Sequence, residues 1–544
     1  MKHLKNLKKI TALSMSLIAS MSAFASCGGG NGSNSDSSIV IDPSKTQVVV
    51  GYYDGGLGRD WLNAVIKKFE AINTDIQIVP RWDKKRYETD TLPANIHTYN
   101  EDVLLVDIVT QEYEDSNIYY DISDIVNTPL TEYGENESIL DKMTPDMQKA
   151  MKSRDGKYYS LPYYEGSYNI YYDMRLFEEK ALYMDGDGGW SDGSVKSAGK
   201  DGVIGTYDDG LPATFDEFFT LCNYMLEKGI TPFTWTGVNG FYVSKMLESY
   251  WASYEGLEDF RLNYTLDSGD EEYTFKNGTS EVITRENAYK LRDGQAGQEE
   301  ALEFANTILN GYNGQNGGGK YHSSNVWATG QTHMAAQDEF LFSSALGTPI
   351  GFIIEGTYWE REAAESFASL YKRTKNSEDK YGNRRFGLMP YPTAHGEQGK
   401  EHVIASITGS RVFINQHTDV PEEAKAFFRY LHTDEAMSLM TSLSQTFRPF
   451  DYTVKEEHKS NLTPLGKQIV EAFKAENAVG TLIPDICVDD CFRGTKWYGY
   501  CSLIGANTIN DLQNGKTIAS YLEGFKVDAT EWSERVGAWV AAQK

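Results

Sequence analysis

The chain has 544 residues, of which 40% are hydrophobic and 24% are charged, so a folded protein with a sizeable core is expected rather than a disordered or fibrous chain. With 51 basic and 78 acidic residues the formal net charge is -27, and nucleic acid is therefore excluded as an expected partner. Aromatic residues are abundant, with 35 Tyr, 24 Phe and 10 Trp, and the ring faces and polar groups of Tyr and Trp suit amphipathic ligands. The alternative for these rings is ordinary core packing.

Residues 1–26 have the pattern of a secretory signal peptide. Four lysines within the first nine residues precede an apolar stretch over 10–25 that is shorter than the ~20 residues a membrane span requires. The sequence Phe24-Ala25-Ser26-Cys27 resembles a bacterial lipobox, in which the cysteine becomes the lipidated first residue. Phe24 departs from the usual leucine, and an ordinary signal peptide with a chance cysteine is the alternative.

Residues 27–44 are expected to form the lipidated Cys27 and a flexible linker, because 28–38 read GGGNGSNSDSS. No later run of 18 apolar residues occurs, so we expect the remainder outside the bilayer. The predicted location is the cell surface, with a lipid anchor in the outer face of the cytoplasmic membrane.

Strand and helix patterns alternate in the first part of the mature chain. Apolar runs predict strands over 47–51, 75–79 and 103–109, and helical spacing predicts a helix over about 60–72. This alternation indicates a parallel α/β sheet, in which ligands bind beyond the carboxyl ends of the strands. Tyr53, Asp54 and Asp107 follow or close such strands and are candidate ligand-binding residues.

Further elements follow along the chain. Thr214 and Glu217 form a predicted capping box at the start of a helix over 215–228. The other predictions are strands over 231–236, 352–354 and 412–414, and helices over 174–182, 241–258, 421–431 and 434–444, with a helical close after 521.

Several motifs occur in a fixed order behind the signal peptide. They are the strand at 48–51, LPYYEGSYNIYYDMRLF at 161–177, IIEGTYWE at 353–360, FGLMPYP at 386–392, ITGSRVFIN at 407–415 and PEEAKAFFRYLHTDEA at 421–436. In this order they resemble the extracellular solute-binding proteins of bacterial ABC importers, in the carbohydrate-binding class that includes maltose-binding protein.

The resemblance implies an α/β fold of two lobes, each a central sheet flanked by helices, joined by hinge crossovers. The expected boundaries are 45–162 plus 335–408 for lobe one and 163–334 plus 409–544 for lobe two. A carbohydrate, with an oligosaccharide expected, would be captured between the lobes by domain closure and delivered to the transmembrane subunits of the permease. The resemblance further implies a monomer, no catalysis and no required cofactor.

In this class aromatic rings stack on sugars, and Asp, Glu and Arg bind their hydroxyl groups. Each of three candidates has a structural alternative to ligand binding. Trp359 would pack in the core, Asp107 would cap a loop, and Arg411 would form a structural ion pair. The candidate ligand-binding residues are Tyr53, Asp54, Asp107, Tyr164, Glu165, Tyr168, Trp235, Glu355, Trp359 and Arg411.

An acidic, glycine-rich segment over 185–210 departs from the simple pattern. Clustered carboxylates on a flexible loop suit calcium, although the EF-hand template fails at Trp190 and Lys196. A solvated acidic loop is the alternative. The candidate ligands for a structural Ca²⁺ are Asp185, Asp187, Asp192, Asp201 and Asp208.

Other readings remain open. A glycoside hydrolase would need two carboxylates across a cleft, for which Glu165 and Glu355 are the candidates. A surface sugar-sensing or adhesion protein would use the same fold, and a peptide is an alternative ligand. Cys222 is expected to be buried, and one disulfide among Cys487, Cys491 and Cys501 is compatible with export.

Overall fold

The computed structural model describes residues 39–84, 92–107, 118–312, 320–393, 401–408, 410–473, 479–493, 495–501 and 503–544. The chain divides into two units, Met1–Asp42 and Pro43–Lys544, and the second unit holds every helix and strand described below. The predicted signal peptide, Cys27 and the glycine-rich part of the linker lie outside the described residues.

The first sheet has the strand order β2-β1-β3-β14-β4. β1 pairs in parallel with both β2 and β3, whereas β14 is antiparallel to β3 and β4. The parallel pairs confirm the alternation read from the sequence. The strands are β1 (Thr46–Tyr52), β2 (Ile76–Arg81), β3 (Val103–Asp107), β4 (Ser160–Pro162) and β14 (Ser410–Ile414).

The first lobe is this sheet with the helices that pack on it. Helix α1 (Asp60–Ile72) buries Trp61, Val65 and Phe69 at helical spacing in the core of this lobe. The ring of Phe69 contacts Phe427 with centroids 5.1 Å apart. The other helices of this lobe are α3 (Leu92–Asn95), α4 (Ser123–Asn127), α5 (Pro145–Met151), α15 (Pro421–Leu431) and α16 (Asp434–Ser444).

The second sheet has the order β15-β13-β5-β11-β8, and β12 also pairs with β5. β5 reads GSYNIYYD and is buried along its whole length, as expected for a central strand covered on both faces. The strands are β5 (Gly166–Asp173), β8 (Thr231–Trp235), β11 (Ile350–Gly356), β12 (Phe386–Leu388), β13 (His402–Ile407) and β15 (Val479–Leu482).

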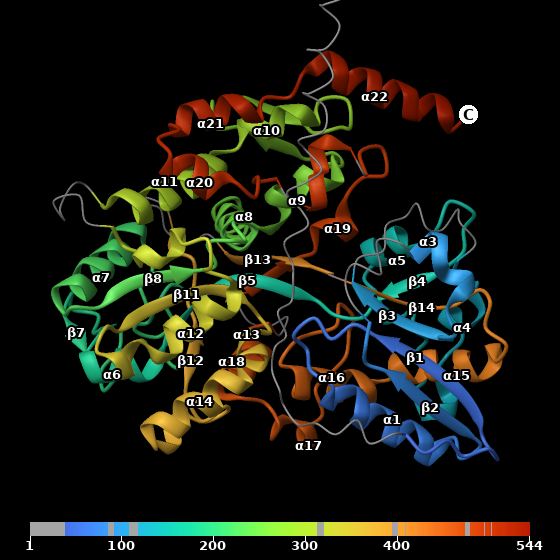
Figure 1. Ribbon diagram of the computed structural model, residues 1–544. Helices are drawn as coiled ribbons and strands as arrows, with labels where there is room; N and C mark the ends of the chain where they lie inside the picture. Colours follow the sequence, from blue (N-terminus) through green and yellow to red (C-terminus); the bar gives the residue numbers. More distant parts are fainter. Residues whose placement is uncertain are drawn as a thin grey trace, which may run out of the picture. The chain divides into compact units, whose positions relative to one another are not determined.

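The second lobe is this larger sheet with its helices, which cover both faces of the sheet in Figure 1. The predicted capping box of Thr214 and Glu217 starts α7, which confirms that prediction. The helices are α6 (Met174–Lys180), α7 (Phe215–Glu227), α8 (Phe241–Glu255), α9 (Leu257–Thr265), α10 (Leu291–Gly294), α11 (Ala296–Asn310), α12 (His333–Ser343), α13 (Trp359–Glu362), α14 (Ala364–Thr374) and α18 (Pro464–Ala472).

The C-terminal part of the chain adds further helices. Two small antiparallel hairpins belong to the same unit. The helices are α17 (Glu456–Lys459), α19 (Pro484–Cys487), α20 (Thr508–Gln513), α21 (Ile518–Phe525) and α22 (Ala529–Ala542); the hairpins are β6 (Tyr183–Met184) with β7 (Trp190–Ser191) and β9 (Glu272–Thr274) with β10 (Ser280–Val282). None of the helices within the described ranges has the length and apolar character needed to cross a bilayer.

Strand pairing corrects the expected lobe boundaries. Residues 335–408 were assigned to lobe one, but β11, β12 and β13 of that segment belong to the sheet of β5. Residues from 409 onward were assigned to lobe two, but β14 pairs with β3 and β4 in the first sheet, where α15 and α16 also pack. The reason is that the chain stays in the second lobe from β5 to β13 before it returns, and sequence order alone does not reveal which sheet completes a strand.

Candidate functional site

Three segments of the chain cross between the two lobes and meet one another. The first crosses at 163–165 between β4 and β5, the second crosses between the end of β13 and the start of β14, and the third crosses after α16. The backbone N–H of Glu165 donates to the carbonyl of Phe447 (2.6 Å), and the Thr446 hydroxyl donates to the carbonyl of Glu165 (2.9 Å). We call this region the junction; Tyr164 and Glu165 lie in it, as the sequence predicted.

The carboxyl ends of β1 and β3 reach the junction from the first lobe. Tyr53 donates its backbone N–H to Leu105 (3.0 Å) and accepts at its carbonyl from the Tyr163 hydroxyl (3.3 Å). Asp54 accepts from the N–H of Gly58 (2.6 Å), so its carboxylate shapes the turn that follows β1. Tyr53 and Asp54 are half-buried.

Asp107 closes β3 opposite Ser410 of β14 and is 8% exposed. Burial raises the pKa of Tyr164 well above its usual value, and the carboxylate of Asp107 adds to the rise. The carboxylate of Asp107 is therefore close enough to Tyr164 to act on its hydroxyl electrostatically.

A group of tyrosines brings the second lobe into the junction. The hydroxyls of Tyr168 and Tyr358 are 3.2 Å apart, and the rings of Tyr168 and Tyr242 are tilted with centroids 4.3 Å apart. Burial raises the pKa of Tyr242 and Tyr358, so both hydroxyls keep their protons at neutral pH. We call Tyr164, Tyr168, Tyr242 and Tyr358 the tyrosine cluster.

Carboxylates surround the crossovers. Burial raises the pKa of Glu165 to about 7; a hydrogen bond with Ser406 opposes the rise, and the Asp485 carboxylate adds to it. The Thr408 hydroxyl donates to the carboxylate of Asp485, which also lies 4.0 Å from the guanidinium of Arg411. Arg411 therefore lies in the junction, but it is next to the carboxylate of Asp485. This agrees with the alternative that Arg411 forms a structural ion pair.

Glu355 lies in a separate buried group. Its carboxylate, 0% exposed, accepts from the Gln337 amide (3.2 Å) and from the N–H of Gly356 (2.7 Å). The same Gln337 nitrogen donates to Glu362 (2.7 Å), which lies 3.4 Å from the ring of His333. Burial raises the pKa of Glu355 to about 8, with the carboxylate of Glu362 adding to the rise.

The two tryptophan predictions are corrected by burial. Trp359 is 0% exposed and packs against Phe386 (centroids 4.9 Å apart) and Phe340 (6.0 Å) inside the second lobe. Trp235 is 1% exposed and packs against His322 and Trp327. An enclosed ring offers no face to a ligand, so both residues belong to the core.

The candidate calcium ligands over 185–208 are not among the described residues whose ligand atoms gather in threes within 4.8 Å of one another. Asp185, Asp192 and Asp201 accept backbone N–H groups two residues further along, and Asp208 accepts from the N–H groups of Lys200 and Asp201. These carboxylates stabilise turns of the loop. Asp187 is exposed.

One group of potential metal ligands occurs in the part of the chain that is described. Glu435, Glu457 and His458 offer ligand atoms within 4.8 Å of one another. Lys68 and Lys455 already pair with Glu435 at 3.0 and 2.8 Å, so the negative charge of this group is neutralised.

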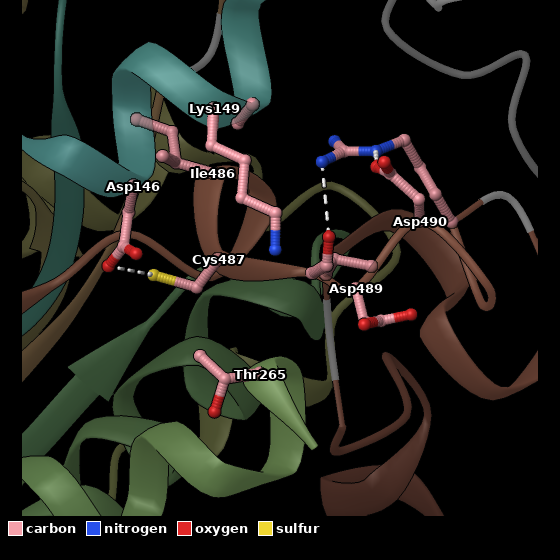
Figure 2. A pocket seen from close by; sticks show the side chains of 10 residues that line it. Asp146, Lys149, Thr265, Ile486, Cys487, Asp489 and Asp490 are labelled. Atoms are coloured by element: carbon pink, nitrogen blue, oxygen red, sulfur yellow. Dashed lines mark hydrogen bonds and ion pairs between the residues drawn. The ribbon is translucent and has the colours of Figure 1, made fainter. Parts of the chain in front are cut away.

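A groove and a small cavity are lined by residues that do not belong to the tyrosine cluster. A groove of about 580 Å³ is lined by Tyr120, Asp121, Ser123, Asp124, Gln416 and Lys425. A cavity of about 30 Å³ lies between α5 and α19, where Figure 2 shows Asp146 facing Cys487, with Oδ2 and Sγ 3.8 Å apart. This space is the size of a water molecule and not of a sugar.

The described cysteines are not paired. Cys222 is buried, as predicted, and the thiols of Cys487 and Cys491 are free. The side chain of Cys501 lies outside the described residues, so the predicted disulfide stays a prediction.

Sequence reasoning missed three residues of the junction. Tyr358 follows the carboxyl end of β11, so the strand-end rule would have found it. Tyr242 lies at the start of α8, where a strand-end search does not look. Asp485 lies in the short helix α19, far along the chain, and no local pattern signals its contact with Thr408.

No family model and no curated protein matches the chain. The chain is similar to many solved structures, among them the following three; each pair of coverages gives the share of this chain first and the share of the other chain second. A probable secreted solute-binding lipoprotein from Streptomyces coelicolor has a TM-score of 0.53 and 13% identity over 89% and 98%. A chitin oligosaccharide binding protein has a TM-score of 0.51 and 16% identity, over 90% of this chain and 100% of the other. The apo-form of RafE from Streptococcus pneumoniae has a TM-score of 0.50 and 15% identity, over 91% of this chain and 100% of the other. The chain therefore has the two-lobed α/β fold of the solute-binding proteins among them, which confirms the fold predicted from the sequence.

Proposed function

We propose that this protein is an extracellular solute-binding lipoprotein that captures a carbohydrate, with an oligosaccharide as the expected ligand, between its two lobes. The observation that carries the proposal is that the half-buried Tyr53 and Tyr164 lie with Asp107 where the crossovers join the lobes, backed by the buried Tyr168 and Tyr358 of the tyrosine cluster. The printed description of one similar structure as a chitin oligosaccharide binding protein supports a sugar ligand.

Sugars present apolar C–H faces and a rim of hydroxyl groups. Tyrosine rings bury the faces, while carboxylates and tyrosine hydroxyls bind the rim. Tyr53 and Tyr164, which are half-buried, have surface left for such contacts. A ligand that contacts both lobes favours the closed arrangement, because only that arrangement makes all the contacts.

The proposal includes an anchor and a partner. Cys27 would carry the lipid after removal of residues 1–26, and the 28–38 linker would let the lobes move beside the membrane. The ligand would be handed to the transmembrane subunits of an ABC permease, and the protein would bind the carbohydrate as a monomer without cleaving it.

A thermal-shift screen tests the binding role. Maltohexaose, cellohexaose, chitohexaose, raffinose and short peptides would each be added to the purified protein, and the products analysed by chromatography. A ligand at 100 times its dissociation constant adds ~2.7 kcal/mol of stability. A saturable shift with one glycan and no product supports the proposal; cleavage would favour a hydrolase, and a shift with peptides alone would reject the carbohydrate.

Two variants locate the site and the anchor. Tyr164→Ala is expected to weaken glycan binding about tenfold by removing a stacking face, which corresponds to about 1.4 kcal/mol. Tyr120→Ala, a half-buried tyrosine at the other end of β14, is the matched control. Cys27→Ser is expected to release the protein from the membrane fraction and to remove the lipid mass.

A further inference from the structure

Arg411, Thr408 and Asp485 form a hydrogen-bonded chain at the second crossover. Nη1 of Arg411 donates to the Thr408 hydroxyl (3.0 Å), and that hydroxyl donates to Oδ2 of Asp485. Nη1 also donates to the carbonyl of Ser410 (3.3 Å). The hydroxyl of Thr408 accepts from the guanidinium and donates to the carboxylate at the same time, so it joins two groups of opposite charge.

The guanidinium and the carboxylate form an ion pair without a direct hydrogen bond. Nη2 of Arg411 lies 4.0 Å from Oδ2 of Asp485, which is beyond the usual length of a hydrogen bond. The hydrogen bonds of Arg411 to described residues use Nη1, which leaves the donors of Nε and Nη2 for a ligand. The two side chains are 15% and 14% exposed, so each is partly open to solvent.

The second oxygen of the Asp485 carboxylate lacks a donor. Oδ1 is enclosed, and none of the residues that the structure describes donates a hydrogen bond to it. An enclosed carboxylate oxygen without a donor costs free energy, and a hydrogen bond from a ligand would offset that cost. Free donors on Arg411 therefore lie next to a free acceptor on Asp485.

The pair lies where the proposed ligand site is. Arg411 of β14 is paired with Pro162 of β4, two residues before Tyr164. On its other side Arg411 is paired with the residue that precedes Asp107 in β3. Asp485 belongs to α19, which packs against α5 of the first lobe and α9 of the second. A group bound by both side chains would join β14 of the first lobe to a helix that contacts both lobes.

We propose that Arg411 and Asp485 together bind one hydroxyl group of the carbohydrate, with Arg411 donating to its oxygen and Asp485 accepting from its O–H. This inference rests on the proposed function and names two of its specificity-determining residues. A carboxylate would accept from Arg411 but has no hydrogen to donate to Asp485, whereas an ammonium group would donate to Asp485 but cannot accept from Arg411. A hydroxyl does both, as Thr408 does in the same chain.

Deleting single hydroxyls of the ligand tests the pair. Calorimetry first finds the shortest malto-, cello- or chito-oligosaccharide, or raffinose, that binds the wild type, and then measures each of its monodeoxy derivatives. We expect one hydroxyl whose removal weakens binding about tenfold or more, because its hydrogen bonds are made to charged groups. In Asp485→Asn the parent glycan should bind about tenfold more weakly, and removal of that same hydroxyl should then have little further effect.

Two further variants separate ligand binding from support of the crossover. Arg411→Lys keeps the positive charge but loses the planar set of donors, so the same hydroxyl should lose its effect there. This variant also supplies the comparison if Asp485→Asn is too unstable to measure. Asp490→Asn, at an exposed position of the same segment, is the matched control and should leave every ratio of deoxy to parent affinity unchanged.

Equal weakening of the parent and of all its deoxy derivatives in both variants would show that the pair only supports the crossover, and it would overturn the inference. Wild-type affinities in both variants would overturn it as well. Either result would leave the proposed function standing. A wild type that binds none of the parent glycans would reject the proposed function, and the inference with it.

Discussion

The carboxylate of Asp60 and the guanidinium of Arg361 lie 2.8 Å apart and join the first turn of α1 to α13. α1 packs in the first lobe and α13 follows β11 of the second, so the pair links the lobes directly. Arg361 also fills the space beside Gly58, where an added Cβ would lie 2.5 Å from its Nη2. Gly58 has a φ of 75°, which favours glycine independently of that contact.

Gly58→Ala is therefore expected to destabilise the protein by ~1–2 kcal/mol through the backbone, while the guanidinium of Arg361, at the end of a flexible side chain, moves aside at little further cost. Arg361→Ala should change the stability by less than ~1 kcal/mol, because Asp60 is 70% exposed and the pair is screened by water. Urea unfolding of both single variants and of the double variant separates the backbone cost at Gly58 from the cost of the steric contact with Arg361. Removing the Arg361 side chain relieves only the steric contact. A Gly58→Ala protein as stable as the wild type would contradict this account.

Two adjacent arginines should differ sharply in their importance. Arg384 is 2% exposed, pairs with Asp173 at 2.5 Å and donates to the carbonyl of Leu341. Arg384→Met leaves the Asp173 carboxylate buried without its partner, and a loss of ~3–5 kcal/mol is expected. Arg385→Met breaks only an exposed pair with Glu178 and should cost less than ~1 kcal/mol. Chemical unfolding measures both, and similar losses would show that burial does not set the difference.

Glu360 should make stability fall as the pH rises. It is 1% exposed, accepts from the Thr463 hydroxyl at 2.5 Å, and burial raises its pKa to about 8. The contribution of Glu360 to the free energy of unfolding is fully present below the usual glutamate pKa and is lost as the pH rises through about 8. Between these two pH values the folded state holds a proton that the unfolded state has released. One proton corresponds to a slope of ~1.4 kcal/mol per pH unit.

Glu360→Gln should accordingly be more stable than the wild type above neutral pH, with a flatter profile between pH ~5 and ~8. Glu365→Gln, an exposed position on α14, is the control and should leave the profile unchanged. Urea unfolding at a series of pH values measures both; a Glu360→Gln profile parallel to that of the wild type would contradict the prediction.

The loop over 185–210 is expected to be stable without calcium. Asp208 is 1% exposed and accepts from the N–H groups of Lys200 and Asp201 at 2.7 and 3.0 Å. Asp208→Asn should weaken these bonds and cost ~1–3 kcal/mol, whereas Asp187→Asn at an exposed position should be neutral. Calorimetric melting with and without EDTA should give the same transition. A lower transition in EDTA that calcium restores would reinstate the metal site.

Local pattern was sufficient for several elements. The helical spacing over 60–72 and the proline-initiated pattern over 421–431 matched α1 and α15, because each helix buries one apolar stripe and begins or ends at a clear boundary. The capping box at Thr214 was equally readable, since its hydrogen bonds lie within four residues.

Long-range organisation could not be derived in the same way. The lobe boundaries failed because β14 pairs with β3 across about 300 residues of chain, and Asp485 reaches the junction from α19. Trp359 carried an aromatic signal, but only the packing of Phe340 and Phe386 around it reveals a core position. Strand-end reasoning did place Tyr53, Asp54 and Asp107 in one region, because β1 and β3 are neighbouring parallel strands and the rule depends on topology rather than on packing.

Hydrogen–deuterium exchange with the oligosaccharide that gives the thermal shift tests the central claim most directly. The account predicts increased protection in both lobes at once, at 52–58 after β1, at 162–168 in the first crossover and at 355–362 after β11. Protection confined to one lobe, or to 120–124 and 416–425 around the Tyr120 groove, would contradict binding at the junction.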